Sequence, residues 1–273
     1  MTILVTAIAA SPIFAFIYCL NSYRRALAGA YDTWWMRLGF GQAFLHFSLT
    51  RLPRSGIDKA MHAEGRAKCL ALAAAPPPTG AIAFVGSSTF TYWRHLEKDM
   101  AAEGISHPPC FNAAFGGSWT KHCLQFADAL CLDYKPRAVV YTCGSNDINT
   151  GQSPSSAAQG FVDFHRALLA ALPGTPLVYV PPTVTPYVAW RGEAARCAEL
   201  SQLVKSYART LQSGTVVAVV DQNQTAGFES DETLYLGDRH HLNDEGHRRL
   251  AKLIAPALRE CLDKVQAIGR GQE

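Results

Sequence analysis

The sequence lacks the closely spaced cysteine and histidine pairs that bind metal ions. Neither a Cys-x-x-Cys pair nor a His-x-x-x-His pair occurs, so the chain gives no indication of a zinc or iron–sulfur site. The eight cysteines are scattered: Cys19, Cys69, Cys110, Cys123, Cys131, Cys143, Cys197 and Cys261. In a chain of this length, such cysteines are more often small buried hydrophobic residues than a disulfide framework. We therefore expect free thiols and no metal.

Charged residues are also scarce, at 17% of the chain, and the formal net charge is only +3. The body of the chain has no basic cluster with interleaved aromatic residues, which argues against a nucleic-acid partner. Internal repeats and low-complexity segments are missing as well. With 273 residues and 48% hydrophobic residues, the composition is that of a globular protein with one large α/β domain and an appendage.

The appendage begins with an almost wholly apolar stretch, Ile3–Leu20, which is followed by Arg24 and Arg25. A cleaved signal peptide needs basic residues before its apolar run, and none stands there. Positive charges flank membrane helices on the cytoplasmic side, so the pattern favours a retained anchor with the main domain in the cytoplasm. The alternatives are export to the periplasm through an atypical signal and a buried docking helix.

A second N-terminal segment, Tyr31–Leu52, places Trp34 and Trp35 beside arginines. This composition is typical of a helix lying in a membrane interface, although a helix packed on the main domain fits nearly as well. The proline-rich segment Pro76–Gly80 then ends a helical stretch. We therefore predict a helical, membrane-associating region over residues 1–75 and the main domain over residues 76–273.

From Ala81 onward, short apolar runs alternate with helical patterns. Strands interleaved with helices form a parallel sheet that is covered by helices on both faces, so the fold class is α/β. The predicted strands are Ala81–Val85, Cys110–Ala114, Ala138–Thr142, Leu177–Val180 and Val216–Val220, and the main predicted helices are Lys121–Leu132, Ala157–Ala171, Glu193–Leu211 and Asp244–Leu262.

The first apolar run leads into Gly86-Ser87-Ser88, and a helix can follow from Thr89 to Leu96. A serine at the carboxyl end of a central strand lies where open α/β sheets bind their ligands. Its backbone N–H would also face a favourable place for developing negative charge. Ser88 is therefore a candidate nucleophile, although Gly-Ser-Ser is also an ordinary strand-to-helix turn.

Small or polar residues follow the second and third predicted strands as well. Gly116-Gly117 would let a backbone N–H approach a bound atom, because no Cβ obstructs it. Asn146 supplies an uncharged amide donor suited to an oxyanion. Each has a plainer interpretation, a glycine-rich loop for the first and an Asx turn for the second.

A fourth motif precedes the last predicted helix. Asp238 stands three residues before His241 and could hold the imidazole Nδ1, which fixes the tautomer in which Nε2 accepts a proton from serine. His240 is the competing candidate, but only two residues separate it from Asp238.

Together these motifs resemble those of the SGNH hydrolases, also called the GDSL-like lipase/acylhydrolase family. The resemblance runs from Ala81 to Leu262, about two thirds of the chain, in the family's order and spacing. The matching residues are Gly86-Ser87-Ser88, Asn112 with Gly116-Gly117, Gly144-Ser145-Asn146-Asp147, and Asp238-Arg239-His240-His241-Leu242-Asn243 with Gly246. The family has Asp where Ser87 stands, but its nucleophile is the last residue of the triplet.

The resemblance implies a flavodoxin-like, three-layer α/β/α sandwich with five parallel strands. It also implies Ser88 as nucleophile, His241 as base and Asp238 as the residue that orients it. The backbone of Ser88, Gly117 and Asn146 would form the oxyanion hole. We therefore expect an enzyme, a serine esterase that cleaves a small-acyl or lysolipid-type carboxylic ester and needs no cofactor.

Three alternatives stay open on the same sequence. The site could transfer an acyl group to a sugar or lipid hydroxyl, or the fold could be a catalytically silent binding protein. The chain could also be a membrane-tethered interaction module. Tyr187 and Trp190 follow the fourth predicted strand and are candidate substrate-rim residues, where they would stack on a sugar ring or line an acyl groove. A stiff proline-rich loop packed on the domain is the alternative for them.

Overall fold

The computed structural model describes residues 54–212, 215–225 and 227–270, so the predictions for Ile3–Leu20 and Tyr31–Leu52 lie outside the described residues. Five parallel strands form one sheet in the order β2-β1-β3-β4-β5. They are β1 (Ile82–Gly86), β2 (Cys110–Asn112), β3 (Ala138–Thr142), β4 (Leu177–Tyr179) and β5 (Val217–Val219). The predicted α/β fold with a five-stranded parallel sheet is confirmed.

Side chains alternate between the two faces of this sheet, as a strand buried on both sides requires. In β1, Ala83 and Val85 join one hydrophobic cluster, whereas Ile82 and Phe84 join the other. All five residues of β1 and of β3 are buried. The residues that follow the carboxyl ends of these two central strands are therefore attached to a rigid, buried backbone.

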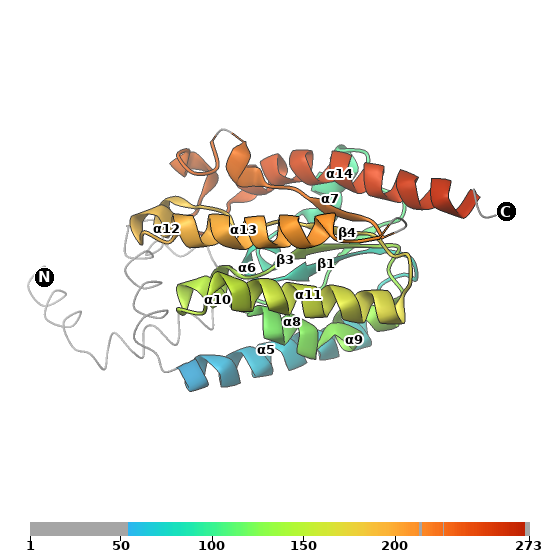
Figure 1. Cartoon of the computed structure of the whole chain (residues 1–273), viewed down its shortest axis with the longest axis horizontal. Helices are drawn as coiled ribbons and strands as arrows, with labels where there is room; N and C mark the ends of the chain where they lie inside the picture. The colour runs from blue at the N-terminus through green and yellow to red at the C-terminus, as the bar shows by residue number, and fades with distance from the viewer. Residues whose placement is uncertain (1–53, 213–214, 226, 271–273) are drawn as a thin grey trace, which may run out of the picture.

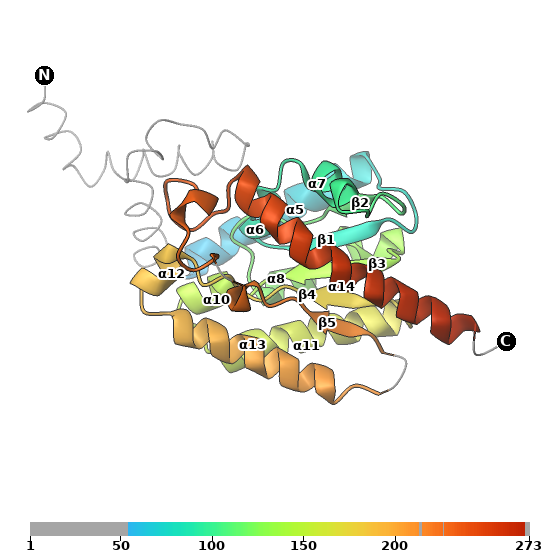
Figure 2. The same ribbon diagram turned by 90° about the horizontal axis from the view of Figure 1, so that it is seen from above.

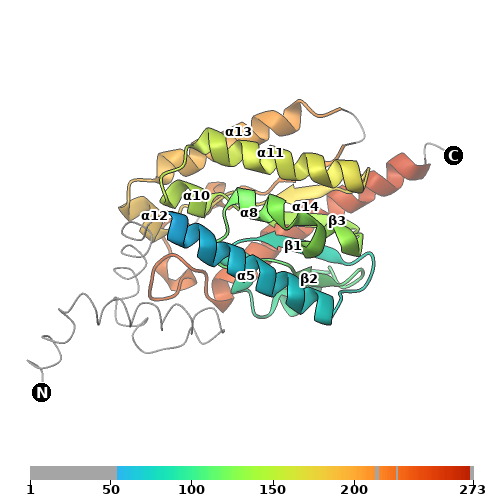
Figure 3. The same cartoon turned by 90° about the horizontal axis from the view of Figure 1, so that it is seen from below.

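Helices cover both faces and complete the three layers (Figures 1, 2 and 3). One layer packs on the Ala83 face and the other on the Phe84 face. The first comprises α5 (Arg54–Ala74), α8 (Thr120–Gln125), α9 (Ala127–Leu130), α11 (Pro154–Ala171) and α13 (Ala194–Arg209); the second comprises α7 (Leu96–Ala102) and α14 (Asp244–Arg270).

Two predicted helices are broken in the structure. The helix expected over Lys121–Leu132 is divided at Phe126, whose ring packs on Phe115 and lies over Gly65, where a Cβ would come within 2.4 Å of it. The helix expected to run from Thr89 to Leu96 stops at Thr91 because Trp93 turns into the core. Aromatic side chains with fixed tertiary partners thus override the local helical pattern.

The helix α5 precedes the proline-rich segment and packs on the same core as the rest of the described chain. Its Leu72 belongs to the cluster on the Ala83 face, and Met61 is buried. The boundary at Pro76 stays a prediction. Of the helices among the described residues, not one combines the length and apolarity that crossing a membrane requires. The seven cysteines of the described segments are free.

Candidate active site

A sharp turn at the end of β1 presents Ser88. A Cβ on Gly86 would lie 1.9 Å from the carbonyl oxygen of Thr142, so only glycine lets β1 and β3 run this close together. The backbone N–H of Ser87 then donates to that same oxygen at 3.0 Å. Ser88 follows as the first residue of α6 (Ser88–Thr91) and is only 7% exposed.

His241 and Asp238 complete a hydrogen-bonded line that begins at Ser88. The Nε2 atom of His241 lies 3.0 Å from the Oγ of Ser88, and its Nδ1 lies 2.6 Å from Oδ2 of Asp238. The other oxygen of Asp238 accepts the backbone N–H groups of His240 and His241, each at 2.9 Å. The loop before α14 thus brings Asp238 and His241 to Ser88, which lies 153 positions before His241 in the sequence.

The charge of Asp238 sets the tautomer of this histidine. Burial by itself would raise the pKa of Asp238, but the imidazole and backbone N–H of His241, together with the nearby His240, outweigh burial and lower the pKa to about 2. An ionised carboxylate only accepts hydrogen bonds, so the proton of a neutral His241 lies on Nδ1. Nε2 then carries a lone pair directed at the Ser88 hydroxyl, as a general base requires.

His240 occupies a different environment. Its Nδ1 lies 3.1 Å from the Oγ1 of Thr185, and its ring packs edge-on against Tyr187 with 5.3 Å between the ring centroids. Burial lowers the pKa of His240 to about 3, so it stays neutral. Of the two neighbouring histidines, it is His241 that faces the nucleophile.

The predicted oxyanion donors lie on the loop that contains Gly117 and on a short helix that contains Asn146, and hydrogen bonds join these two segments to each other and to the nucleophile turn. The Nδ2 of Asn146 donates to the carbonyl of Ser118 at 3.1 Å, which uses one of its two hydrogens. The carbonyl of Gly86 accepts the Ser118 hydroxyl at 3.0 Å and the backbone N–H of Phe115 at 3.1 Å. Gly117, between these contacts, has a positive φ of 75° that favours glycine.

Sequence reasoning missed the partner of Asp147, which follows Asn146 in the short helix α10 (Ser145–Asn149). This buried carboxylate accepts the Thr120 hydroxyl at 2.8 Å and the Thr120 N–H at 3.1 Å. Burial raises the pKa of Asp147 to about 6 in spite of these bonds. Two successive side chains of α10 therefore hold two nearby residues, Ser118 and Thr120, of the loop that contains Gly117.

His247 is a second residue that the motif analysis left out. Its Nε2 lies 2.9 Å from the carbonyl oxygen of Thr89, the residue after the nucleophile, and its ring stacks on Trp93. Because a carbonyl only accepts, Nε2 carries the proton and the buried Nδ1 has no hydrogen-bond partner. The first turns of α14 thus support the Ser88 turn as well as the His241 loop.

The two predicted rim residues have different surroundings. Trp190 ends α12 (Pro186–Trp190), is 57% exposed, and lines an open groove of about 740 Å³ together with polar side chains such as Asn223 and Glu232. Tyr187 is 0% exposed and packs against His240 and Trp190. Contrary to its predicted position, Tyr187 therefore offers no open face to a ligand.

One group of potential metal ligands occurs among the described residues. Asp58, His62 and His122 place ligand atoms within 4.8 Å of one another between α5 and α8. However, Nδ1 of His122 accepts the backbone N–H of Trp119 at 3.0 Å, so its Nε2 carries the proton that faces Asp58 at 2.7 Å. A metal needs a lone pair on that nitrogen, so the donor set fits a clamp between the two helices rather than a metal ion.

The comparisons agree with the fold and with the motifs. Solved structures with similar folds include a GDSL-like lipase from Bacteroides thetaiotaomicron, with a TM-score of 0.56 and 17% identity over 72% of this chain and 98% of that one. A carbohydrate esterase of family 3 from Talaromyces cellulolyticus gives a TM-score of 0.55 and 18% identity over 67% and 98% of the two chains. The protein TesA gives 0.55 and 20% over 66% and 99%.

A comparison with curated proteins gave no match. The family model described as GDSL-like lipase/acylhydrolase matches residues 82–249, more than half of the chain. Ser88, Asn146, Asp238 and His241 all lie within this range, so the resemblance seen in the motifs is confirmed. The chain belongs to the GDSL-like lipase/acylhydrolase family and is a serine hydrolase that acts on ester bonds.

Proposed function

We propose that the chain hydrolyses a carboxylic ester with Ser88 as nucleophile, His241 as general base and Asp238 as the carboxylate that orients it. The observation that carries this proposal is the continuous line of two hydrogen bonds, 3.0 Å from Ser88 Oγ to His241 Nε2 and 2.6 Å from His241 Nδ1 to Asp238. The line lies at the carboxyl end of a central strand, where open α/β sheets bind their substrates.

The reaction follows from these contacts. The Oγ of Ser88 attacks the ester carbonyl while Nε2 of His241 takes its proton, and the C–O bond of the tetrahedral intermediate then breaks as the alcohol receives that proton. Water, deprotonated by the same nitrogen, attacks the acyl-enzyme and releases the acid. Asp238 stabilises the imidazolium in both halves and is not protonated itself.

The negative charge of the tetrahedral intermediate needs donors that are already in place. We assign this role to the backbone N–H groups of Ser88 and Gly117 and to the second hydrogen of the Asn146 amide. These groups are neutral, so they require no titration, and the bonds of Asn146 and Asp147 to the Gly117 loop support their fixed arrangement. Loss of one such donor raises the barrier by roughly 2.7–4 kcal/mol.

A fluorophosphonate probe tests this assignment directly, because it phosphonylates only a serine that is activated by a base. We expect one covalent adduct at Ser88, found by mass spectrometry of a tryptic digest, and none in the His241→Gln variant. An adduct on another serine, or equal labelling of His241→Gln, would contradict the assignment. The expected substrates are esters of a carbohydrate or a lysolipid, and competition by sugar acetates or by lysophospholipids in the same assay identifies the class.

We further propose that Ile3–Leu20 anchors the enzyme in a membrane with the catalytic domain on the cytoplasmic side. The guanidinium of Arg54, the first described residue, lies against Gly151 just after α10, so the described chain begins near the edge that carries the active site. The full chain should float with membranes, whereas a chain that starts at Arg54 should stay in the supernatant. Protease added to spheroplasts, whose outer membrane has been removed, should leave the domain uncut; cutting there would favour export.

A further inference from the structure

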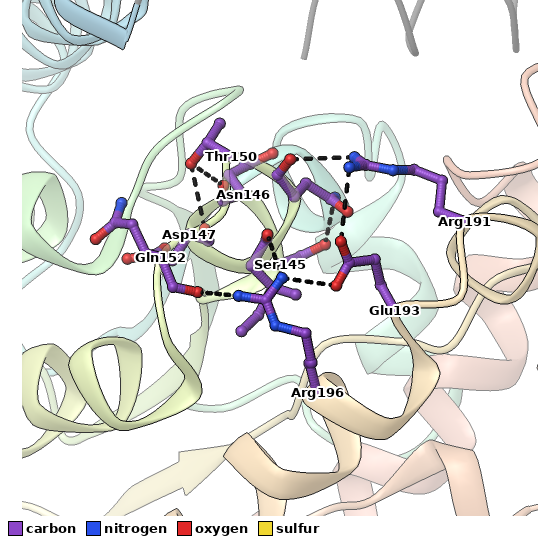
Figure 4. Close-up of polar contacts among 10 residues, drawn as sticks. Ser145, Asn146, Asp147, Thr150, Gln152, Arg191, Glu193 and Arg196 are labelled. Atoms are coloured by element: carbon purple, nitrogen blue, oxygen red, sulfur yellow. Dashed lines mark hydrogen bonds and ion pairs between the residues drawn. The ribbon is translucent and has the colours of Figure 1, made fainter. Parts of the chain in front are cut away.

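Two arginines and a glutamate hold the carboxyl-terminal end of α10, the short helix that carries Asn146 (Figure 4). Arg191 donates from Nη1 to the carbonyl of Asn149 at 3.1 Å. Arg196, in the first turn of α13, donates to the carbonyl of Ile148 at 3.4 Å and to that of Gln152 at 2.5 Å. These contacts reach the main chain of α10 and of the loop that follows it.

The charges of this cluster are paired with each other. Glu193 lies 2.8 Å from Nη1 of Arg196 and 3.6 Å from Nη2 of Arg191. The Arg191 and Glu193 side chains are only 12% and 14% exposed, so solvent screens these ion pairs weakly. Their mutual pairing leaves few rotamers to each side chain, and the guanidinium donors are therefore fixed relative to α10.

The chemistry of a helix end explains what the arginines supply. Positive charge is favourable beside the carbonyls of the last turn of a helix. Here Arg191 donates to the carbonyl of Asn149, and Arg196 adds a second donor to that of Ile148, which also accepts the N–H of Gly151 at 2.9 Å. At the other end, Asn146 is bonded to Ser118 and Asp147 to Thr120. Thr150 closes the turn, because its hydroxyl donates to the carbonyl of Asn146 at 2.7 Å. The helix is thus fixed at both ends.

We infer that Arg196, supported by Arg191 and Glu193, is a positioning residue for the Asn146 amide. Arg196 holds the last turn of α10, and the amide of Asn146 in the first turn therefore stays directed at the site of the oxyanion. The inference rests on the proposed function, because it assumes that Asn146 donates to the oxyanion. A misplacement of about 1 Å is enough to cost a large factor in rate when donors must be fixed in advance.

Arg196→Met is the variant that tests it, since methionine keeps most of the apolar stem and removes the five donors. We expect kcat for p-nitrophenyl acetate to fall about tenfold, with KM within about twofold, because the donor acts in the transition state. Arg196→Lys should lower kcat less, because the lysine ammonium group replaces some of the guanidinium N–H donors. Lys205→Met on the same helix is the matched control: it breaks a comparable ion pair with Asp221, at 2.6 Å, and should leave kcat unchanged.

A double-mutant cycle with Asn146→Ala separates positioning from a general loss of stability. If Arg196 acts through Asn146, Arg196→Met should cost about threefold or less in the Asn146→Ala background. A full tenfold loss there, or an unchanged kcat in folded Arg196→Met, would overturn the inference. If Arg196→Met does not fold, Arg196→Lys enters the same cycle. An unmodified chain that neither turns over ester nor takes the fluorophosphonate at Ser88 would instead refute the proposed function.

Discussion

Replacing Ser88 with alanine is expected to lower kcat for p-nitrophenyl acetate by a factor on the order of 10⁴ to 10⁶. The Oγ of Ser88 is the atom that Nε2 of His241 faces, at 3.0 Å, so its removal leaves the base without a proton to take. Alanine keeps the backbone of α6, so circular dichroism and the thermal unfolding midpoint should stay close to those of the parent.

Ser87 provides the matched control for this experiment. It is also buried and stands next to Ser88, but its side chain makes no capping bond, and its contact with Thr142 uses the backbone N–H, which alanine keeps. Ser87→Ala should therefore retain kcat within a few-fold of the parent. A folded Ser88→Ala variant with parental turnover would refute the nucleophile assignment, and loss of activity in Ser87→Ala alone would move the assignment by one residue.

Ser88, Gly117 and Asn146 could be predicted because each follows a short apolar strand. Parallel strands end at one edge of the sheet, so residues that follow β1, β2 and β3 meet there whatever the loops between them do. Asp238 and His241 lie before a strongly patterned helix, and their separation fits one hydrogen-bonded turn. The local sequence therefore contains most of the information on where Ser88, Asn146 and His241 lie.

The residues that hold this arrangement could not be predicted in the same way. Arg196 reaches the carbonyl of Ile148, 48 positions earlier, and Asp147 reaches Thr120, 27 positions earlier. Such contacts depend on how helices of one layer pack beside one another, and they leave no periodic signal in the chain. Tyr187 failed as a rim residue for the same reason: an aromatic side chain after a strand can turn inward or outward, and packing against His240 decides the direction.

Two buried carboxylates near the site illustrate how the surroundings assign different roles to the same group. Burial raises the pKa of Asp147 to about 6, because hydrogen bonds from the neutral Thr120 offset only part of the loss of solvent. Burial also opposes ionisation of Asp238, but the imidazole and backbone N–H of His241, together with the nearby His240, lower its pKa to about 2. Asp238 therefore stays ionised at any pH above about 4, as a residue that fixes a histidine tautomer must.

Asp238→Asn should consequently lower kcat by about 10⁴ while the loop keeps its shape. The amide oxygen can still accept the N–H groups of His240 and His241, but the amide nitrogen is a donor and faces Nδ1 of the imidazole. That donor favours the tautomer with the proton on Nε2, which can no longer accept the proton of Ser88. Steady-state kinetics with the short ester, together with fluorophosphonate labelling, would measure the loss.

The pH profile distinguishes this cause from a shifted base. In the parent, activity should fall on acidification because a histidine acts as a base only when its imidazole is neutral. Asp238 does not contribute to that limb, since its pKa of about 2 is far below it. In Asp238→Asn, raising the pH to 9 should not restore the rate, because a wrong tautomer is not corrected by deprotonation.

His240→Gln can keep the bond to Thr185, so its kcat should stay within about threefold of the parent. An inactive His240→Gln variant together with an active Asp238→Asn variant would identify His240 as the base instead of His241.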